Sequence, residues 1–165
     1  MKKIYDNTII RRADYNDATA IMDIIVERSN WLKNKQIKQW ESFLERDITY
    51  YTEKIEKETV YVVIIDECVC GTFLLQSVDK YWEEDDEAFY IHHLAVKQDY
   101  PGLGKYIINQ IKNMAIDAKK NYIRIDHVQE NKKLNSYYEE LGFEIKKELY
   151  DGMYHCLLRE MQLAN

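Results

Sequence analysis

The chain has 165 residues, 46% of them hydrophobic and 32% charged, which predicts one globular domain over residues 1–165. Acidic residues outnumber basic ones by 29 to 23. The resulting formal charge of −6 argues against a protein that neutralises nucleic-acid phosphates. One proline, five glycines and the lack of low-complexity runs exclude a disordered or collagen-like chain.

Neither an export signal nor a membrane span is predicted. Residues 1–7 include the basic residues of a secretory leader, but charged residues among 6–14 interrupt any apolar core. The most hydrophobic stretch, 60–65, is far shorter than the roughly 18 apolar residues that span a bilayer. Nothing beside Cys68 and Cys70 completes a zinc set, so we expect reduced thiols and no metal. The sequence therefore predicts a cytoplasmic protein that binds no membrane.

The N-terminal third of the chain is predicted to be helical after one short strand over residues 8–12. Ile21, Ile24 and Ile25 recur at helical spacing and predict the first helix. A second amphipathic helix is expected over residues 41–57. Its inner face is expected to comprise Phe43, Leu44, Ile48, Tyr51 and Ile55.

The middle of the chain changes to a strand pattern. The β-branched run 60–65 predicts a strand, and residues 69–78 supply an antiparallel partner. Five consecutive acids over 83–87 repel one another and are expected in a solvated loop, where attraction of cationic amines is the alternative role. A further strand is expected over residues 88–96.

The C-terminal half adds two helices and three strands. Residues 102–118 form the helix with the clearest amphipathic period, and a short helix is expected over 131–141. The three strands are predicted over 122–128, 143–149 and 153–161. Residues 88–128 form a βαβ unit, whose strands are parallel, between antiparallel hairpins. The chain is thus predicted to be α/β, a mixed, partly antiparallel twisted sheet of about seven strands flanked by about four helices.

A Gly-x-Gly turn at residues 102–104 follows a strand and begins a helix. It exposes backbone N–H groups beside the positive end of a helix dipole, which favours phosphate binding, although such a turn is as often only a tight loop. A dinucleotide-binding oxidoreductase would want a third glycine where Ile107 stands and an acid on the next strand. Asp126 supplies the acid, but the glycine is missing, which disfavours that class.

Three segments form a joint pattern over most of the chain. They are Tyr90-Ile91-His92-His93-Leu94-Ala95-Val96, the helix that opens with Gly102-Leu103-Gly104, and Asn131-x-x-Leu134-x-x-x-Tyr138-x-x-x-Gly142-Phe143. Together they resemble the GNAT superfamily of acyl-coenzyme A-dependent N-acetyltransferases, and the order of the elements is similar to that fold. The turn departs from the family pattern, because Pro101 directly precedes Gly102, and one glycine and the usual basic or amide residue are missing.

The resemblance implies transfer of an acetyl group from acetyl-coenzyme A to a primary amine of a small molecule or peptide, directly in a ternary complex. It puts the N–H of Leu94 at the thioester oxygen and pairs Leu94 and Val96 with the pantetheine arm. The implied cofactor-binding set is Leu94, Ala95, Val96, Gly102, Leu103, Gly104, Lys105, Tyr106, Asn131 and Tyr138. A non-catalytic acyl-coenzyme A sensor is the alternative, since the turn is altered and Tyr90 replaces a glutamate frequent in the family.

Acetylation of an amine needs a base, because with a pKa near 10.4 only about one amine in a few thousand is neutral at pH 7. Similarity to arylalkylamine acetyltransferases puts His92 in that role, which its reference pKa near 6.5 suits. His127, Asp126 or a chain of water molecules are the alternatives. The resemblance implies that Tyr138 is the acid that protonates the departing thiolate.

The acceptor pocket is predicted from less specific features. Its residues are expected to be Trp31, Gln39, Trp40, Tyr90 and His127. Family members form the pocket wall between the first two helices, where both tryptophans stand, although aromatic packing at a helix corner is the alternative. Strand alternation is expected to put Leu94 and Ile91 on opposite faces. The tyrosine-rich C-terminal strands are candidates for a homodimer surface.

Overall fold

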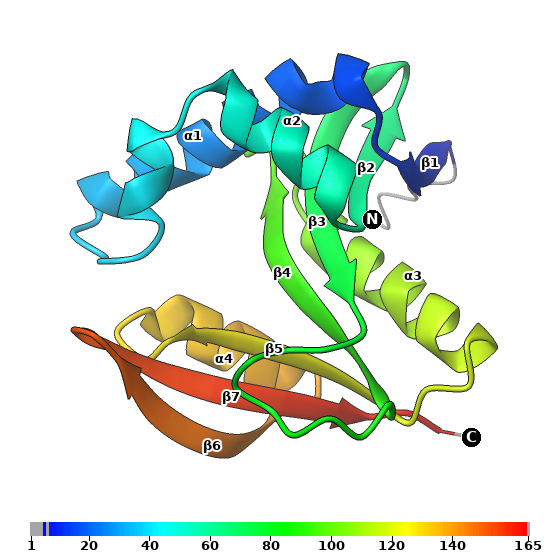
Figure 1. Cartoon of the computed structure of the whole chain (residues 1–165), viewed down its shortest axis with the longest axis vertical. Coiled ribbons are helices and arrows are strands. Elements are labelled where there is room, and N and C mark those ends of the chain that lie inside the picture. The colour runs from blue at the N-terminus through cyan, green and yellow to red at the C-terminus, as the bar shows by residue number, and fades with distance from the viewer. Residues whose placement is uncertain (1–4, 6, 165) are drawn as a thin grey trace.

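The computed structural model describes residue 5 and residues 7–164, which form a seven-stranded sheet in the order β1-β2-β3-β4-β5-β7-β6 (Figure 1). The strands are β1 (Thr8–Arg12), β2 (Val60–Ile65), β3 (Cys68–Gln76), β4 (Ala88–Val96), β5 (Tyr122–Val128), β6 (Glu144–Asp151) and β7 (Tyr154–Gln162). The helices are α1 (Ala18–Asn34), α2 (Ile48–Lys57), α3 (Leu103–Asp117) and α4 (Lys132–Glu140), with 3₁₀ turns η1 (Tyr15–Asp17) and η2 (Glu41–Glu45). The predicted fold class is confirmed. The basic residues of the predicted N-terminal pattern, at 2 and 3, lie outside the described residues.

Hydrophobic clusters cover both faces of the sheet. Ile24 of α1 packs with Val62 in one cluster, and Ile107 of α3 packs with Val63 in the other. Neighbouring residues of β2 enter different clusters because alternate side chains of a strand point to opposite faces. Among the described residues, no helix combines the length and the apolarity that crossing a bilayer requires.

β4 and β5 form the parallel pair of the predicted βαβ unit, but over a short distance. Their register contains Ala88 with Tyr122, Phe89 with Ile123 and Tyr90 with Arg124. Beyond this point the two strands spread apart, as Figure 1 shows, while β5 stays paired with β7 along its whole length. One edge of β4 and one edge of β5 therefore face an opening in the sheet.

The helix expected over 41–57 is in fact two elements. Arg46 is extended, with φ −85° and ψ 141°, and separates η2 from α2. The carboxylate of Asp47 accepts the N–H of Thr49 at 3.0 Å and caps α2. Ile48 is consequently 39% exposed, and its predicted place on the inner face is wrong. The apolar period hid the break because Phe43 and Tyr51, one on each side of it, are both buried.

A β-bulge interrupts β4 just before its C-terminal end. His93 has φ 51°, and the register against β3 shifts by one residue at this point. Ile91 and Leu94 both pack in the α3 cluster, whereas Ala95 packs in the α1 cluster. The predicted alternation of Ile91 and Leu94 is therefore wrong, because the extra residue changes the face of every side chain after it.

The acidic run over 83–87 is exposed, as predicted, but two of its members are paired with basic residues. Asp85 accepts two hydrogen bonds from the guanidinium of Arg124, at 3.1 and 2.8 Å, and Asp86 accepts one from Lys120 at 2.6 Å. Arg124 is only 5% exposed and needs such a partner, since an unpaired buried charge is costly. The segment between β3 and β4 is thus fastened to β5.

Candidate active site

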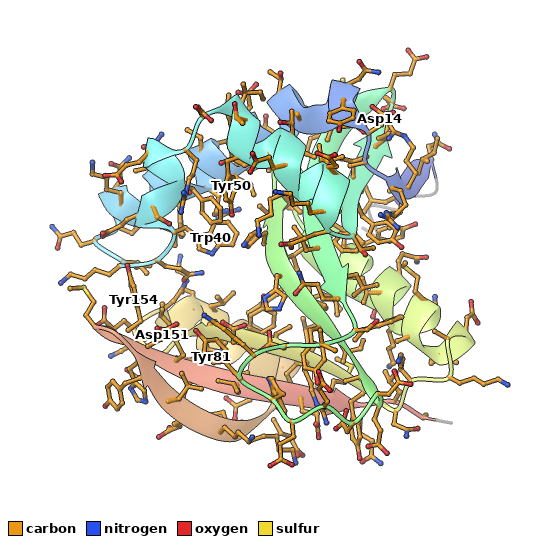
Figure 2. All side chains as sticks on the ribbon, viewed as in Figure 1. Asp14, Trp40, Tyr50, Tyr81, Asp151 and Tyr154 are labelled. Atoms are coloured by element: carbon orange, nitrogen blue, oxygen red, sulfur yellow. The ribbon has the colours of Figure 1, made fainter. Side chains whose placement is uncertain are left out.

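A cleft of about 880 Å³ opens where β4 and β5 spread apart. This volume is typical of small-molecule sites. Trp40 lies on one side of it, and Asp151 and Tyr154 lie on the other (Figure 2). The predicted site residues that line the cleft are Trp31, Gln39, Trp40, His92, Leu94, Ala95, Val96, Gly102, Gly104, His127, Asn131 and Tyr138.

The edge of β4 presents backbone groups to this cleft. The N–H of Lys97 donates to Cys70, toward β3, at 2.9 Å. Because backbone groups alternate between the two edges of a strand, those of Leu94 and Val96 point away from β3. The guanidinium of Arg28, which also lines the cleft, donates to the Val96 carbonyl at 3.4 Å. This edge can pair with an extended, amide-containing ligand as an additional strand.

The first turn of α3 forms one end of the cleft. Gly102 has φ 83°, which glycine adopts without strain. The N–H of Leu103 donates to the preceding loop at 3.1 Å, and that of Tyr106 donates to Gly102 at 3.1 Å. These two predicted phosphate donors are thus already bonded. The amides of Gly104 and Lys105 remain as candidates, although the side chain of Lys105 is not among the described residues that line the cleft.

Asn131 joins the two walls of the cleft. Its side-chain oxygen accepts the N–H of Leu134 at 3.2 Å and caps α4. Its side-chain nitrogen donates to Gln39 Oε1 at 3.3 Å, across 92 positions of the sequence. Both residues were predicted to contact ligands. In the structure they are hydrogen-bonded to each other, which fixes the distance between α4 and the segment after α1.

Tyr138 is a buried tyrosine at the edge of the cleft. It lines the cleft from α4, and its ring lies 5.5 Å from that of His127 and 5.6 Å from that of Phe143. Burial, aided by Tyr137 and by the charge of Asp126, raises the pKa of the hydroxyl above its ordinary value near 10. The group therefore keeps its proton at neutral pH and can donate it.

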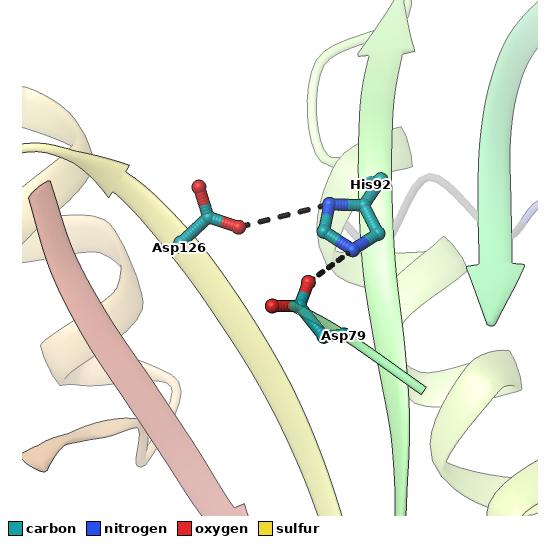
Figure 3. A group of neighbouring side chains, drawn as sticks. All are labelled: Asp79, His92 and Asp126. Carbon is teal, nitrogen blue, oxygen red and sulfur yellow. Dashed lines mark ion pairs between the residues drawn. The ribbon is translucent and has the colours of Figure 1, made fainter. Parts of the chain in front are cut away.

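His92 lies between two carboxylates, as Figure 3 shows. Its Nε2 is 2.7 Å from Oδ2 of Asp79, and its Nδ1 is 3.6 Å from Oδ1 of Asp126. Burial disfavours the charged imidazole, but the hydrogen bond to Asp79 and the charge of Asp126 outweigh burial and raise the pKa of His92 above 6.5. Burial also disfavours the charged form of Asp126. It therefore raises the pKa of this carboxyl, although the neighbouring His92 acts to lower it.

The same three residues bring ligand atoms within 4.8 Å of one another, which is also the spacing of a metal site. Two ligands of one tetrahedral zinc ion are about 3.3 Å apart, from zinc–ligand distances of 2.0–2.1 Å. The 2.7 Å between Asp79 and His92 is shorter and is that of a charge-assisted hydrogen bond. In this arrangement the cluster is hydrogen-bonded rather than poised around an ion.

Two predicted acceptor-binding residues have other partners. Tyr90 is 3% exposed, and its hydroxyl accepts a hydrogen bond from Arg124 at 2.8 Å. It does not line the cleft among the described residues, so its predicted place in the pocket is wrong. His127 borders the cleft, but its Nδ1 is bonded to the Val128 carbonyl and its Nε2 accepts from Arg159 at 2.9 Å. Burial lowers its pKa, and neither ring nitrogen is free to take a proton.

Sequence reasoning missed Asp79 and Tyr137. Asp79 stands in the segment between β3 and β4, which carries no family motif, and reaches His92 across 13 positions. Tyr137 lines the cleft, and its hydroxyl would be 3.1 Å from a Cβ placed on Gly104. The sequence signal for Tyr137 is its place on the same helix beside Tyr138.

Comparison with known proteins agrees with this geometry. A model of the "Acetyltransferase (GNAT) family" matches residues 20–143. The chain belongs to the GNAT acetyltransferase family. The resemblance inferred from β4, the glycine turn and α4 is thus confirmed.

Relatives of this GNAT chain are similar over nearly its full length. An uncharacterized N-acetyltransferase of Bacillus subtilis (strain 168), YesJ, is 30% identical over 159 residues, 90% of this chain and 88% of the relative. A GNAT family acetyltransferase from Listeria monocytogenes has a TM-score of 0.74 at 23% identity, covering 94% of this chain and 95% of that one. PaiA N-acetyltransferase from Thermoplasma acidophilum, solved with coenzyme A, has a TM-score of 0.72 at 15% identity, covering 94% and 98%.

Proposed function

We propose that this GNAT acetyltransferase moves an acetyl group from acetyl-coenzyme A directly to a primary amine of a small molecule or peptide. Family membership supports the acetyl transfer, and the coenzyme A complex of the Thermoplasma relative supports the donor. The observation that carries the proposal is the edge of β4 beyond its pairing with β5, where backbone groups at Leu94 and Val96 are available to the amides of a pantetheine arm once Arg28 yields the Val96 carbonyl.

The cofactor half of the cleft would hold the donor by its backbone. Leu94 and Val96 pair with the pantetheine arm, beside Ala95, and the amides of Gly104 and Lys105 receive the diphosphate at the positive end of α3. When bound, acetyl-coenzyme A supplies the thioester carbon that the amine attacks. The side chains of Lys97 and Lys133 also line the cleft and balance the phosphate charge.

Three groups of the chain carry the chemistry. His92 takes a proton from the acceptor ammonium, so that the neutral amine attacks in a ternary complex. The N–H of Leu94 stabilises the charge on the thioester oxygen while the C–N bond forms and the C–S bond breaks. Tyr138 donates its proton to the departing thiolate, and the second proton that the nitrogen loses as the amide forms passes through water to the Tyr138 phenolate. Trp31 and Trp40 line the acceptor side of the cleft, and Gln39 is positioned there by its hydrogen bond to Asn131.

The decisive experiment measures thiol release from acetyl-coenzyme A over a panel of primary amines, together with thermal stabilisation by the cofactor. The proposal predicts cofactor-induced stabilisation and amine-dependent thiol release. Stabilisation without thiol release for any amine would instead identify an acyl-coenzyme A sensor. Stabilisation by NAD and not by acetyl-coenzyme A would identify the dinucleotide-binding class.

We further propose one domain over residues 1–165 that acts in the cytoplasm as a homodimer. The single sheet from β1 to β7 supports the domain, and the free cysteines among the described residues fit a reducing compartment. Tyr150 and Met153, 76% and 75% exposed at the β6–β7 hairpin, support an interface there. Light scattering should give twice the chain mass, and Tyr150→Lys should return it to the monomer value.

A further inference from the structure

Asp79 is the most buried member of the cluster around His92. Its side chain is 5% exposed and does not line the cleft, whereas His92 and Asp126 do, among the described residues. Oδ1 of Asp79 accepts the N–H of Tyr81 at 2.8 Å, and Oδ2 faces His92 Nε2 at 2.7 Å. Both carboxylate oxygens therefore have partners, which fixes the orientation of the group.

The segment that carries Asp79 is fastened on both sides. Lys80 lies 3.6 Å from Asp151, and the hydroxyl of Tyr81 donates to the same carboxylate of β6. Asp85, farther along the segment, holds Arg124 of β5. Asp79 thus rests on a clamped loop rather than a free one, and its distance to His92 is set by contacts with two different strands.

The partner of Nε2 decides which nitrogen of His92 can act. An ionised carboxylate only accepts hydrogen bonds, so Asp79 requires the proton of a neutral imidazole to be on Nε2. The lone pair then lies on Nδ1, which faces Asp126 on the cleft side. Burial opposes ionisation of Asp79, but His92 and the Tyr81 amide outweigh it and lower its pKa, which keeps the carboxylate charged.

We propose that Asp79 is the positioning residue that presents Nδ1 of His92 as the base, and that Asp126 receives the acceptor ammonium beside it. This inference rests on the proposed acetyl transfer and adds how its first step is arranged. One proton passes from the ammonium nitrogen to Nδ1, leaving a neutral amine and an imidazolium between two carboxylates. No group besides the amine and the imidazole changes its proton count.

The surrounding charges act on this pair from several elements. Glu58 at the end of α2 also favours the imidazolium, and the half-buried neighbour His93 on β4 stays neutral because desolvation lowers its pKa to about 3. Lys80 and Asp151 act on Asp126 with opposite signs. The pKa of His92 is raised, so kcat/KM should increase with pH as the imidazolium loses its proton, and its acidic limb should lie above pH 6.5.

Asp79→Asn removes one of the three carboxylate charges that raise the pKa of His92. The acidic limb of kcat/KM should therefore move to lower pH. The plateau rate should fall at least tenfold, because an amide can donate to Nε2 and leave the proton on Nδ1. Glu84→Gln, the same loss of charge at an exposed residue of the same segment, is the control and should move neither. An unmoved limb in Asp79→Asn would overturn the positioning role.

Nitrogen-15 NMR of His92 tests the dyad in the unaltered chain and without any substrate. The neutral ring should carry its proton on Nε2, and the titration midpoint should lie above 6.5. A proton on Nδ1 would overturn the inference. Because this measurement needs no catalysis, it separates a failure of the dyad from a failure of the proposed acetyl transfer.

The role of Asp126 is tested by comparing the KM for the amine with the KM for acetyl-coenzyme A in a variant. Asp126→Asn should raise the KM for the amine at least tenfold and leave the KM for acetyl-coenzyme A within twofold. Binding of acetyl-coenzyme A by calorimetry provides the folding control. An increase confined to the acetyl-coenzyme A KM would place Asp126 at the donor instead and overturn this half of the inference.

Discussion

In the half of the cleft proposed for the cofactor, the groups offered to a ligand are backbone atoms, at Leu94, Val96 and the first turn of α3. In the half proposed for the acceptor they are side chains, such as Trp40, Asp126 and Asp151, carried by three segments far apart in sequence. Backbone groups survive substitution, whereas side chains do not. The cofactor half of the cleft therefore depends less on the identity of its side chains than the acceptor half does.

The largest expected effect is at the point where the two halves meet. Tyr138→Phe keeps the buried ring but removes the proton donor, so kcat should fall by roughly 10² to 10³. The Kd for acetyl-coenzyme A should stay within twofold, because the hydroxyl acts on the leaving group and not on the bound arm. Stopped assays of thiol release measure kcat, and calorimetry measures Kd. Unchanged kcat would remove Tyr138 as the acid.

Loss of Arg124 should weaken binding of the amine in the acceptor half of the cleft and leave binding of acetyl-coenzyme A in the cofactor half unchanged. Its guanidinium holds Asp85 and donates to Glu160 at 2.8 Å, and breaking such a buried pair costs about 3 kcal/mol or more. Arg124→Met should therefore lower the free energy of unfolding by about that amount and raise the KM for the amine. Acetyl-coenzyme A should bind as before.

Denaturant unfolding measures the cost in Arg124→Met. Arg46→Gln, an exposed arginine, is the control and should change stability by less than about 0.5 kcal/mol. A loss of acetyl-coenzyme A binding as large as the loss of amine binding would contradict the separation of the two halves.

Acid should lower the free energy of unfolding through His93, whose ring lies beside that of Trp40 in the cleft wall. Burial lowers the pKa of His93 to about 3, so the unfolded chain binds a proton that the folded chain does not. Stability contributed by the neutral ring is present above pH 6.5 and is lost as the pH falls. Between pH 8 and pH 5 the free energy of unfolding should decrease by about 2 kcal/mol from this residue.

His93→Phe should remove most of that slope, since a phenyl ring keeps the edge contact to Phe43, 5.0 Å away, and does not titrate. Urea midpoints at the two pH values supply the measurement. An equally steep loss of stability in the variant would assign the acid sensitivity to another group, with buried His127 as the next candidate.

The smallest expected effect lies within the cofactor half. A Cβ on Gly104 would be 3.1 Å from the hydroxyl of Tyr137, which must move aside. Gly104→Ala should cost about 1 kcal/mol and lower the Tm by about 3 °C. Adding Tyr137→Phe removes the contact and should restore the Tm. A double variant as unstable as Gly104→Ala would show that another contact limits this turn.

The difference between the halves also explains what the sequence could and could not predict. The bounds of β4 and β5 follow from runs of apolar and β-branched residues and agree with the structure. Tyr138 follows from the family resemblance of the segment from Asn131 to Gly142, in which the expected helix is present. Local patterns of this kind are fixed by neighbours in the chain.

Long-range contacts left no such trace. The bulge at His93 puts Leu94 on the other face of the sheet, and the residue types around it do not indicate the extra residue. Asp79 looks like any acid in a polar loop, and contacts of its segment with Asp151 and Arg124 bring it to His92. Tyr90 likewise resembles a pocket residue in the sequence, but its hydroxyl accepts a hydrogen bond from Arg124.

Hydrogen–deuterium exchange of the individual amides tests most directly whether the β4 edge and the α3 turn bind the donor. Saturating coenzyme A should slow exchange at Val96, Gly104 and Lys105, and acetyl-coenzyme A should in addition slow exchange at Leu94, because only the acetylated form has the thioester oxygen that this N–H faces. Equal exchange at all four amides with and without acetyl-coenzyme A, at concentrations that saturate binding, would contradict the account.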